Sequence, residues 1–216
     1  PSLAAELSAA THAMAVVEGG VPGGNFGWAV EAGDFNDDGT TDVAVGAPYA
    51  GGGKGAAFVF TGPLAGLYEA NRDEVVKFVG ASTLAAAGFS LAAVDYNADG
   101  KTDLAIGSPK DAIASHKAGA VQVVFGGQVL PSVMDMGDAD VVLYGAWGDQ
   151  LATSLAGGDL NNDGFTDLMV GSPRYSVGGN KRGAVFVMYA NPAAAGAGYL
   201  PSIADVALLG PTAYAE

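Results

Sequence analysis

The sequence predicts an all-β fold built from repeated four-stranded antiparallel sheets. Three observations support this prediction: a nine-residue acidic pattern that occurs three times, apolar segments of strand length around each copy, and 34 glycines that suit many tight turns. The acidic pattern recurs every 60 residues or so, roughly, which indicates one supersecondary unit copied in tandem. With 216 residues, the chain is long enough to bury a sizeable core.

Each acidic pattern has oxygen-bearing side chains at positions 1, 3, 5 and 9 and a glycine at position 6. A short loop uses these residue types to surround a hard cation such as Ca²⁺, whereas zinc and copper prefer Cys or His. An EF-hand would need a carboxylate at position 12, where the sequence has Val45, Ile106 and Val170 inside apolar runs. We therefore predict three calcium sites in loops between strands, with metal-free turns as the alternative. The predicted side-chain ligands are Asp34, Asn36, Asp38, Asp42, Asp95, Asn97, Asp99, Asp103, Asp159, Asn161, Asp163 and Asp167, joined by the main-chain carbonyls of Thr40, Lys101 and Phe165.

Apolar segments follow each acidic pattern at matching places. The first segment ends in Gly46-Ala47-Pro48, Gly107-Ser108-Pro109 or Gly171-Ser172-Pro173, and two further strand-like segments come later in each copy. Together with the strand that enters the loop, every unit has four short strands joined by turns. Radial repetition of four-stranded sheets is how a β-propeller protects its sheet edges. We therefore predict three complete propeller blades with partial strands on either side.

These motifs resemble the FG-GAP repeats of integrin α-subunit β-propellers. Phe26-Gly27 and Gly46-Ala47-Pro48 carry both signatures of that family in the first unit, with the aspartate loop between them. The "FG" half is degraded to Ala87-Gly88 and Leu151-Ala152 in the other two units, while the loop and the "GAP" half persist. The resemblance implies a non-catalytic, calcium-stabilised module for adhesion or assembly.

Three blades are fewer than a closed propeller needs, since such rings have between about four and eight blades. We expect the chain to be part of a larger propeller of about seven blades, or an arc that another chain closes. The expected division is an N-terminal segment over 1–24 with the outer strand of a preceding blade, three blades over 25–80, 81–145 and 146–210, and the start of a further repeat at 211–216.

The composition narrows the classes of partner and compartment. A formal net charge of −14 disfavours nucleic acid, and no apolar run approaches the length of a membrane span. The chain has no cysteine, which neither requires nor excludes an oxidising compartment. Calcium loops work best where calcium is plentiful, so we expect a location outside the cell or in an organelle lumen.

Loops of a four-stranded meander alternate between two faces. The aspartate loops share one face with the connections between strands three and four, whose apolar residues we expect to pack under their own blade. The opposite face carries the loops between strands two and three and the links between blades, with most of the basic residues. Aromatic and arginine residues often anchor interfaces, so a protein or glycan partner is expected there. The candidate partner-binding residues are Tyr49, Lys54, Lys110, Lys117, Trp147, Arg174, Tyr175, Lys181 and Arg182.

No arrangement in the sequence predicts catalysis. His12 and His116 are the only histidines, and there is no thiol, nucleophile elbow or phosphate-binding loop. The leading hypothesis is a calcium-binding module for adhesion or protein–protein assembly. Three alternatives stay open: a carbohydrate-binding propeller that uses Trp147 or Tyr175, an accessory propeller of a hydrolase such as a phospholipase D, and a scaffold subunit of a large complex.

Overall fold

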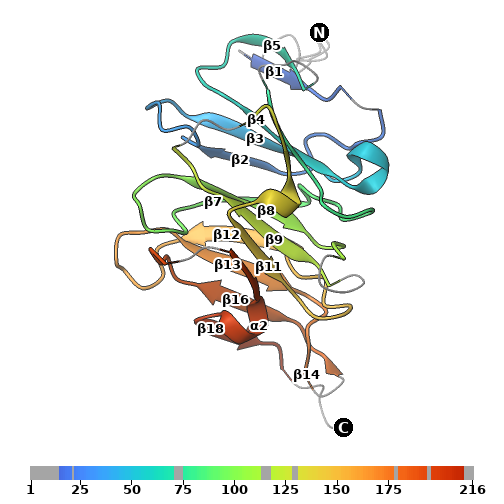
Figure 1. Cartoon of the computed structure of the whole chain (residues 1–216), viewed down its shortest axis with the longest axis vertical. Helices are drawn as coiled ribbons and strands as arrows, with labels where there is room; N and C mark the ends of the chain where they lie inside the picture. Colours follow the sequence, from blue (N-terminus) through green and yellow to red (C-terminus); the bar gives the residue numbers. More distant parts are fainter. Residues whose placement is uncertain are drawn as a thin grey trace, which may run out of the picture.

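The computed structural model describes residues 15–20, 22–70, 75–112, 118–127, 131–177, 180–193 and 196–211. Its sheets follow one another along the long axis of the molecule, in the order of the chain (Figure 1). The innermost strands of successive blades, β2, β7 and β12, lie against one another. This is how blades pack around a propeller axis.

Each repeat forms one four-stranded antiparallel meander, which confirms the predicted blades. The first blade consists of β2 (Val30–Gly33), β3 (Asp42–Ala47), β4 (Ala56–Phe60) and β6 (Val76–Val79). The second consists of β7 (Ser90–Val94), β8 (Asp103–Ser108), β9 (Ala120–Val124) and β11 (Val141–Tyr144). The third consists of β12 (Ser154–Gly158), β13 (Asp167–Ser172), β16 (Ala184–Met188) and β18 (Val206–Leu209).

The connection between strands three and four of each repeat contributes a further strand to the preceding blade. β10 (Val133–Asp135) of the second repeat pairs in parallel with β6 of the first. β17 (Gly196–Tyr199) of the third repeat pairs in parallel with β11 of the second. β5 (Gly66–Glu69) pairs in the same way with β1 (Ala15–Glu18), which precedes the first blade. Successive repeats are therefore joined by backbone hydrogen bonds at their outer strands as well as by packing.

These crossing strands correct one expectation from the sequence. The apolar residues of the three-to-four connections do not all pack under their own blade, because Leu67, Val133 and Ile203 are 52%, 62% and 46% exposed. The segments cross to the neighbouring blade, where an added edge strand keeps one side open to solvent. Leu200, at the start of the short helix α2 (Leu200–Ile203), is fully buried as expected.

Glycines allow the links between blades to approach closely. Gly55 and Gly119 both have a φ of 78°, and an added Cβ would lie 2.3 Å from the nitrogen of Ala87 or 2.5 Å from that of Leu151. A left-handed backbone and such a close contact are together compatible only with glycine. The core accordingly lies largely between blades: one apolar cluster spans the first and second blades, and another spans the second and third.

The remaining short elements lie in the loops between strands two and three. They are the 3-10 turn η1 (Ala50–Gly53) and the small hairpin of β14 (Ser176–Val177) and β15 (Asn180–Lys181); a second 3-10 turn, η2 (Met136–Asp138), follows β10. The predicted leading strand is described only from Ala15 onward, and the segment predicted to open a further repeat lies outside the described residues apart from residue 211.

Candidate functional site

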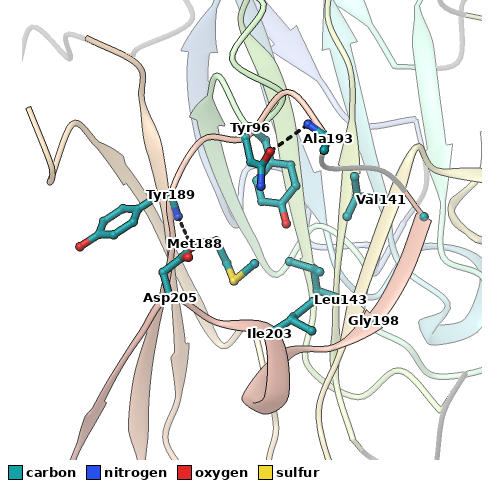
Figure 2. Close-up of a pocket in the computed structure, with 11 residues that line it drawn as sticks. Tyr96, Val141, Leu143, Met188, Tyr189, Ala193, Gly198, Ile203 and Asp205 are labelled. Atoms are coloured by element: carbon teal, nitrogen blue, oxygen red, sulfur yellow. Dashed lines mark hydrogen bonds between the residues drawn. The ribbon is translucent and has the colours of Figure 1, made fainter. Parts of the chain in front are cut away.

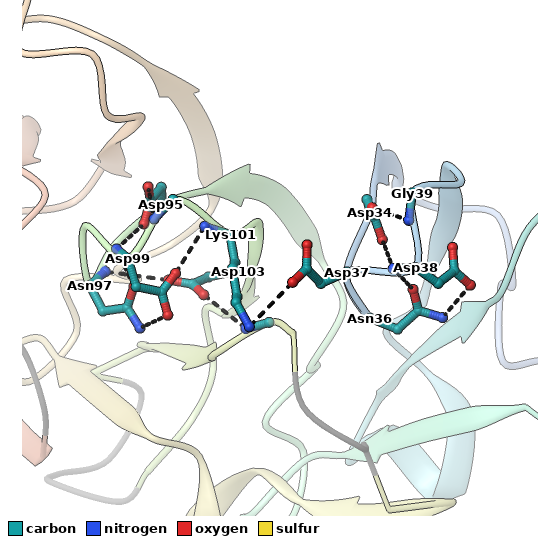
Figure 3. A network of polar contacts seen from close by, with 12 residues as sticks. Asp34, Asn36, Asp37, Asp38, Gly39, Asp95, Asn97, Asp99, Lys101 and Asp103 are labelled. Atoms are coloured by element: carbon teal, nitrogen blue, oxygen red, sulfur yellow. Dashed lines mark hydrogen bonds and ion pairs between the residues drawn. The ribbon is translucent and has the colours of Figure 1, made fainter.

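The first aspartate loop, residues 34–42, is held together by its own side-chain oxygens (Figure 3). Oδ1 of Asp34 and Oδ1 of Asn36 each accept a hydrogen bond from the backbone N–H of Asp38 at 3.1 Å. Oδ2 of Asp34 also accepts from the N–H of Gly39 at 2.9 Å, and the Asn36 amide donates to Asp38 at 2.9 Å. The side chains at positions 1, 3 and 5 are thereby brought next to one another.

The other two aspartate loops, residues 95–103 and 159–167, repeat this geometry. The backbone N–H of Asp99 donates to positions 1 and 3 of its loop at 3.0 and 3.1 Å. That of Asp163 does so at 3.1 Å in both cases. Position 4 is left-handed in all three loops, with φ values of 59°, 55° and 62° at Asp37, Ala98 and Asn162. The shared sequence pattern therefore produces one shared loop conformation.

The aspartate at position 9 has a different environment from the rest of each loop. Asp103 is fully buried, and its two oxygens accept hydrogen bonds from the N–H groups of Tyr96 at 2.9 Å and Gly126 at 2.8 Å. Asp42 and Asp167 are also fully buried and accept from the equivalent pairs of N–H groups. This carboxylate ties the start of the loop to the end of the third strand.

Burial and crowding act on the ionisation of these carboxylates. Burial raises the pKa of Asp103 to about 6, although its hydrogen bonds from backbone N–H groups oppose the shift. Burial also raises the pKa of Asp42 and Asp95, with nearby aspartates of the same loop adding to it. Hydrogen bonds from Thr40 and Asn36 lower the pKa of the exposed Asp38. A bound cation would favour the ionised form of every carboxylate in the loop.

The donor set of each loop fits a hard cation. All the side-chain donors are carboxylate or amide oxygens, and each of those at positions 1, 3 and 5 takes part in the hydrogen bonds that gather the loop. The described residues contain no group of three or more Asp, Glu, His or Cys side chains arranged to hold a metal ion. The amide oxygen of an asparagine is accordingly required as a ligand in each loop. The carbonyl ligands predicted at Thr40, Lys101 and Phe165 stay a prediction.

The three aspartate loops lie on one face of the blades. Residues of all three border a groove of about 340 Å³, including Gly33, Asp95 and Gly164. An ion pair of 3.3 Å between Lys101 and Asp37 connects the second loop to the first (Figure 3). We call this the aspartate-loop face.

A second cavity, of about 270 Å³, lies where the third repeat crosses to the second blade (Figure 2). Its apolar wall includes Leu143 and Met188, and burial raises the pKa of Tyr96, which also lines it, to about 12. The cavity has a local cause in the sequence. Gly198 pairs with Leu143 of β11, whereas in the preceding crossing the larger Met134 pairs with Phe78 of β6.

The loops between strands two and three and the links between blades meet on the opposite face. Tyr49 and Lys110 come from successive loops, and the Lys110 ammonium lies 5.4 Å from the centre of the Tyr49 ring. Trp147 is 71% exposed in a link, whereas Tyr175 packs edge-on against Phe186 of its own blade with ring centres 5.0 Å apart. Of the other candidate residues, Arg174 and Lys181 are exposed, Lys54 and Arg182 are partly buried, and Lys117 lies outside the described residues.

The family model for the FG-GAP repeat matches the chain three times, at residues 26–60, 87–124 and 151–188. The chain belongs to the FG-GAP repeat family. Each match contains one aspartate loop and runs from the "FG" position into the third strand of a blade. The three blades described above are therefore FG-GAP blades, and the resemblance noted in the sequence is confirmed.

Relatives of these FG-GAP repeats occur in two kinds of larger protein. Integrin alpha-5 of Xenopus laevis is 32% identical over 174 residues, which cover 77% of this chain and 15% of the relative. Phosphatidylinositol-glycan-specific phospholipase D of Homo sapiens is 32% identical over 186 residues, covering 79% and 21%. Integrin alpha-V of Gallus gallus is 31% identical over 184 residues, covering 82% and 16%. The chain thus spans a small part of the length of each of these relatives.

Sequence reasoning missed three residues on the opposite face of the FG-GAP blades. Trp28 and Phe89, which directly follow the "FG" glycines, have ring centres 5.2 Å apart, and Trp28 is also 5.8 Å from Tyr49. Leu84 lies beside them in the link between the first two blades and is 59% exposed. The two aromatic residues share one position of the repeat, and that periodicity is a signal that could have identified them.

Proposed function

We propose that this chain is a non-catalytic calcium-binding propeller module that mediates adhesion or protein–protein assembly outside the cell or in an organelle lumen. The observation that carries the proposal is the threefold repetition of one all-oxygen loop in one conformation. Independent turns would not need the same ligand types at the same positions in every blade. Membership of the FG-GAP repeat family and likeness to integrin alpha subunits support the same conclusion.

Calcium would act as a structural ion in this module. The carboxylates at positions 1 and 5 lie close together and repel each other when ionised. A divalent cation among positions 1, 3, 5 and 9 would offset this repulsion and fix the ends of the first two strands of each blade. The chain would then present a rigid opposite face to a protein partner. Among the described residues, no helix is long and apolar enough to cross a membrane.

A calcium titration of the purified chain tests the proposal. Isothermal calorimetry is expected to reveal three calcium sites, and the melting temperature is expected to be higher in calcium than in EDTA, because calcium binds the folded loops and not the unfolded chain. Asp38→Asn, at position 5 of the first loop, should remove or weaken one of the three sites.

Asp37→Asn is the matched control for that substitution. It removes the same charge from the same loop, at position 4, where the third loop already has Asn162 with a φ of 62°. Calcium binding by this variant should match that of the unmodified chain. The proposal would be wrong if calcium gave no heat of binding and no rise in melting temperature, or if both variants lost the same amount of binding.

A further inference from the structure

The opposite face has a cavity of about 320 Å³ between the first and second blades. Tyr49 and Gly53 of one loop, Lys110 and Ala112 of the next, and Leu84 of the link between the blades line it. Its volume is in the lower part of the range for sites that bind small molecules or a peptide side chain. It lies away from the aspartate loops, so calcium binding does not account for it.

Leu84, at the rim of this cavity, occupies a position where the other repeats have glycine. Its φ is 64°, and the residues that precede the "FG" position by the same interval in the other repeats are Gly23 and Gly148, with φ values of 75° and 81°. A side chain in this left-handed conformation is strained, and glycine is not. The first junction between blades retains this strain and presents a leucine that is 59% exposed. Strain of this kind is often retained at binding sites.

An aromatic cluster forms the adjoining wall. The Trp28 ring packs edge-on against Tyr49 and tilted against Phe89, so these rings support one another. The next junction has no equivalent, because Thr153 and Arg174 follow the same motifs there in place of Phe89 and Lys110. The apolar surface is therefore a property of this one junction and not of the repeat in general.

Lys110 adds a positive charge beside the apolar surface. Its ammonium lies over the Tyr49 ring, and within the described part of the chain the only ion pair joins Lys101 to Asp37. Lys110 therefore has no carboxylate partner there, in a chain whose formal net charge is −14. A ligand with an acidic group next to an apolar one would complement both the charge and the surface.

We infer that this cavity binds an acidic peptide segment of a partner protein, with a bulky apolar side chain in the cavity and a neighbouring carboxylate on Lys110. The inference rests on the proposed function, because it specifies the chemistry of the protein partner. Anchors of this kind, buried next to Tyr and Trp side chains, contribute most of the energy of many protein interfaces.

Four probes test the inference on the full chain in calcium: the capped peptides Gly-Phe-Glu-Gly, Gly-Phe-Lys-Gly and Gly-Ala-Glu-Gly, and lactose. NMR titration should show that Gly-Phe-Glu-Gly shifts the amides of Gly53, Leu84 and Ala112. Its affinity should exceed that of the lysine peptide by about tenfold, because one charge is attracted to Lys110 and the other repelled. The alanine peptide should also bind more weakly, since it lacks the apolar group.

Two variants separate binding from folding. Lys110→Gln should abolish the preference for glutamate over lysine, while Lys181→Gln, with the same change of charge on the same face, should leave it intact. Leu84→Gly should weaken binding of the phenylalanine peptide without lowering the melting temperature, because glycine relieves the strained backbone.

The inference is overturned if the glutamate and lysine peptides bind equally, if the shifts lie elsewhere, or if no peptide shifts the cavity amides. It is also overturned if lactose binds in place of the peptides, which would indicate a carbohydrate site. A fall in melting temperature for Leu84→Gly would assign that residue a purely structural role. None of these results bears on the calcium titration, so the two proposals fail separately.

Discussion

The carboxylate of Asp103 accepts a hydrogen bond of 2.8 Å from the backbone N–H of Gly126, which follows the third strand of the same blade. Its second oxygen accepts from Tyr96, at the start of the aspartate loop. The same side chain is therefore a predicted calcium ligand and a structural link between two parts of the blade. Its two roles should be separable by experiment.

We expect Asp103→Ala to destabilise the protein even when no calcium is present. The substitution leaves the N–H groups of Gly126 and Tyr96 without their acceptor, at a cost of about 1–3 kcal/mol for each group that stays buried. Asp99→Ala, at the exposed position 5, should cost less than about 1 kcal/mol in EDTA and more in calcium. Urea unfolding in both conditions measures the two effects. Equal losses for the two variants in EDTA would contradict the structural role of position 9.

The junctions between blades provide a second prediction. Gly119→Ala should cost about 1 kcal/mol or more for its left-handed backbone, and roughly 1–3 kcal/mol in addition because the new Cβ would meet the nitrogen of Leu151 at 2.5 Å. Gly183, with a φ of 72°, is the matched control: its Cβ would meet nothing closer than Pro173 at 3.2 Å. Gly183→Ala should therefore show only the first cost. If urea unfolding gave the same loss for both variants, close packing of the link would not be the cause.

A third prediction concerns the crossing strands. Met136 follows β10 of the second repeat but is fully buried in the cluster that contains Phe35 and Phe78 of the first. Met136→Ala should cost about 2–5 kcal/mol, whereas Val133→Ala, at an exposed position of β10, should cost much less. Hydrogen exchange provides a second measurement, because the N–H of Lys77 in β6 donates to Ser132 at 2.9 Å. Faster exchange at Lys77 in the Met136 variant would show that the second repeat stabilises the first blade; an unchanged rate would argue against it.

Local patterns in the sequence predicted the blades and the aspartate loops because both depend on nearby residues. The loop at Asp34 to Asp42 is closed by its own side chains, and the following strand is a short apolar run. The crossing strands were missed because segments such as Gly196–Tyr199 have no apolar alternation, and their pairing with β11 is set by the neighbouring blade. Leu84 was missed for a related reason: its backbone conformation is imposed by a link that, without that context, is typical of an ordinary turn.

The last prediction uses Asp149, a buried carboxylate on the opposite face. Its oxygen accepts from the N–H of Ala146 at 2.9 Å, but burial raises its pKa above the ordinary value of 3.8. The folded protein therefore keeps this proton to a higher pH than the unfolded chain does, so the group's contribution to stability is fully present below pH 3.8 and is lost as the pH rises through the folded pKa. Relative to Asp149→Asn, which does not titrate, the unmodified protein should lose free energy of unfolding across this window. Urea unfolding of both proteins in EDTA, from about pH 3 to neutral, cancels the contribution of the other carboxylates. A difference that stayed constant or grew with pH would show that the hydrogen bonds outweigh the burial of this side chain.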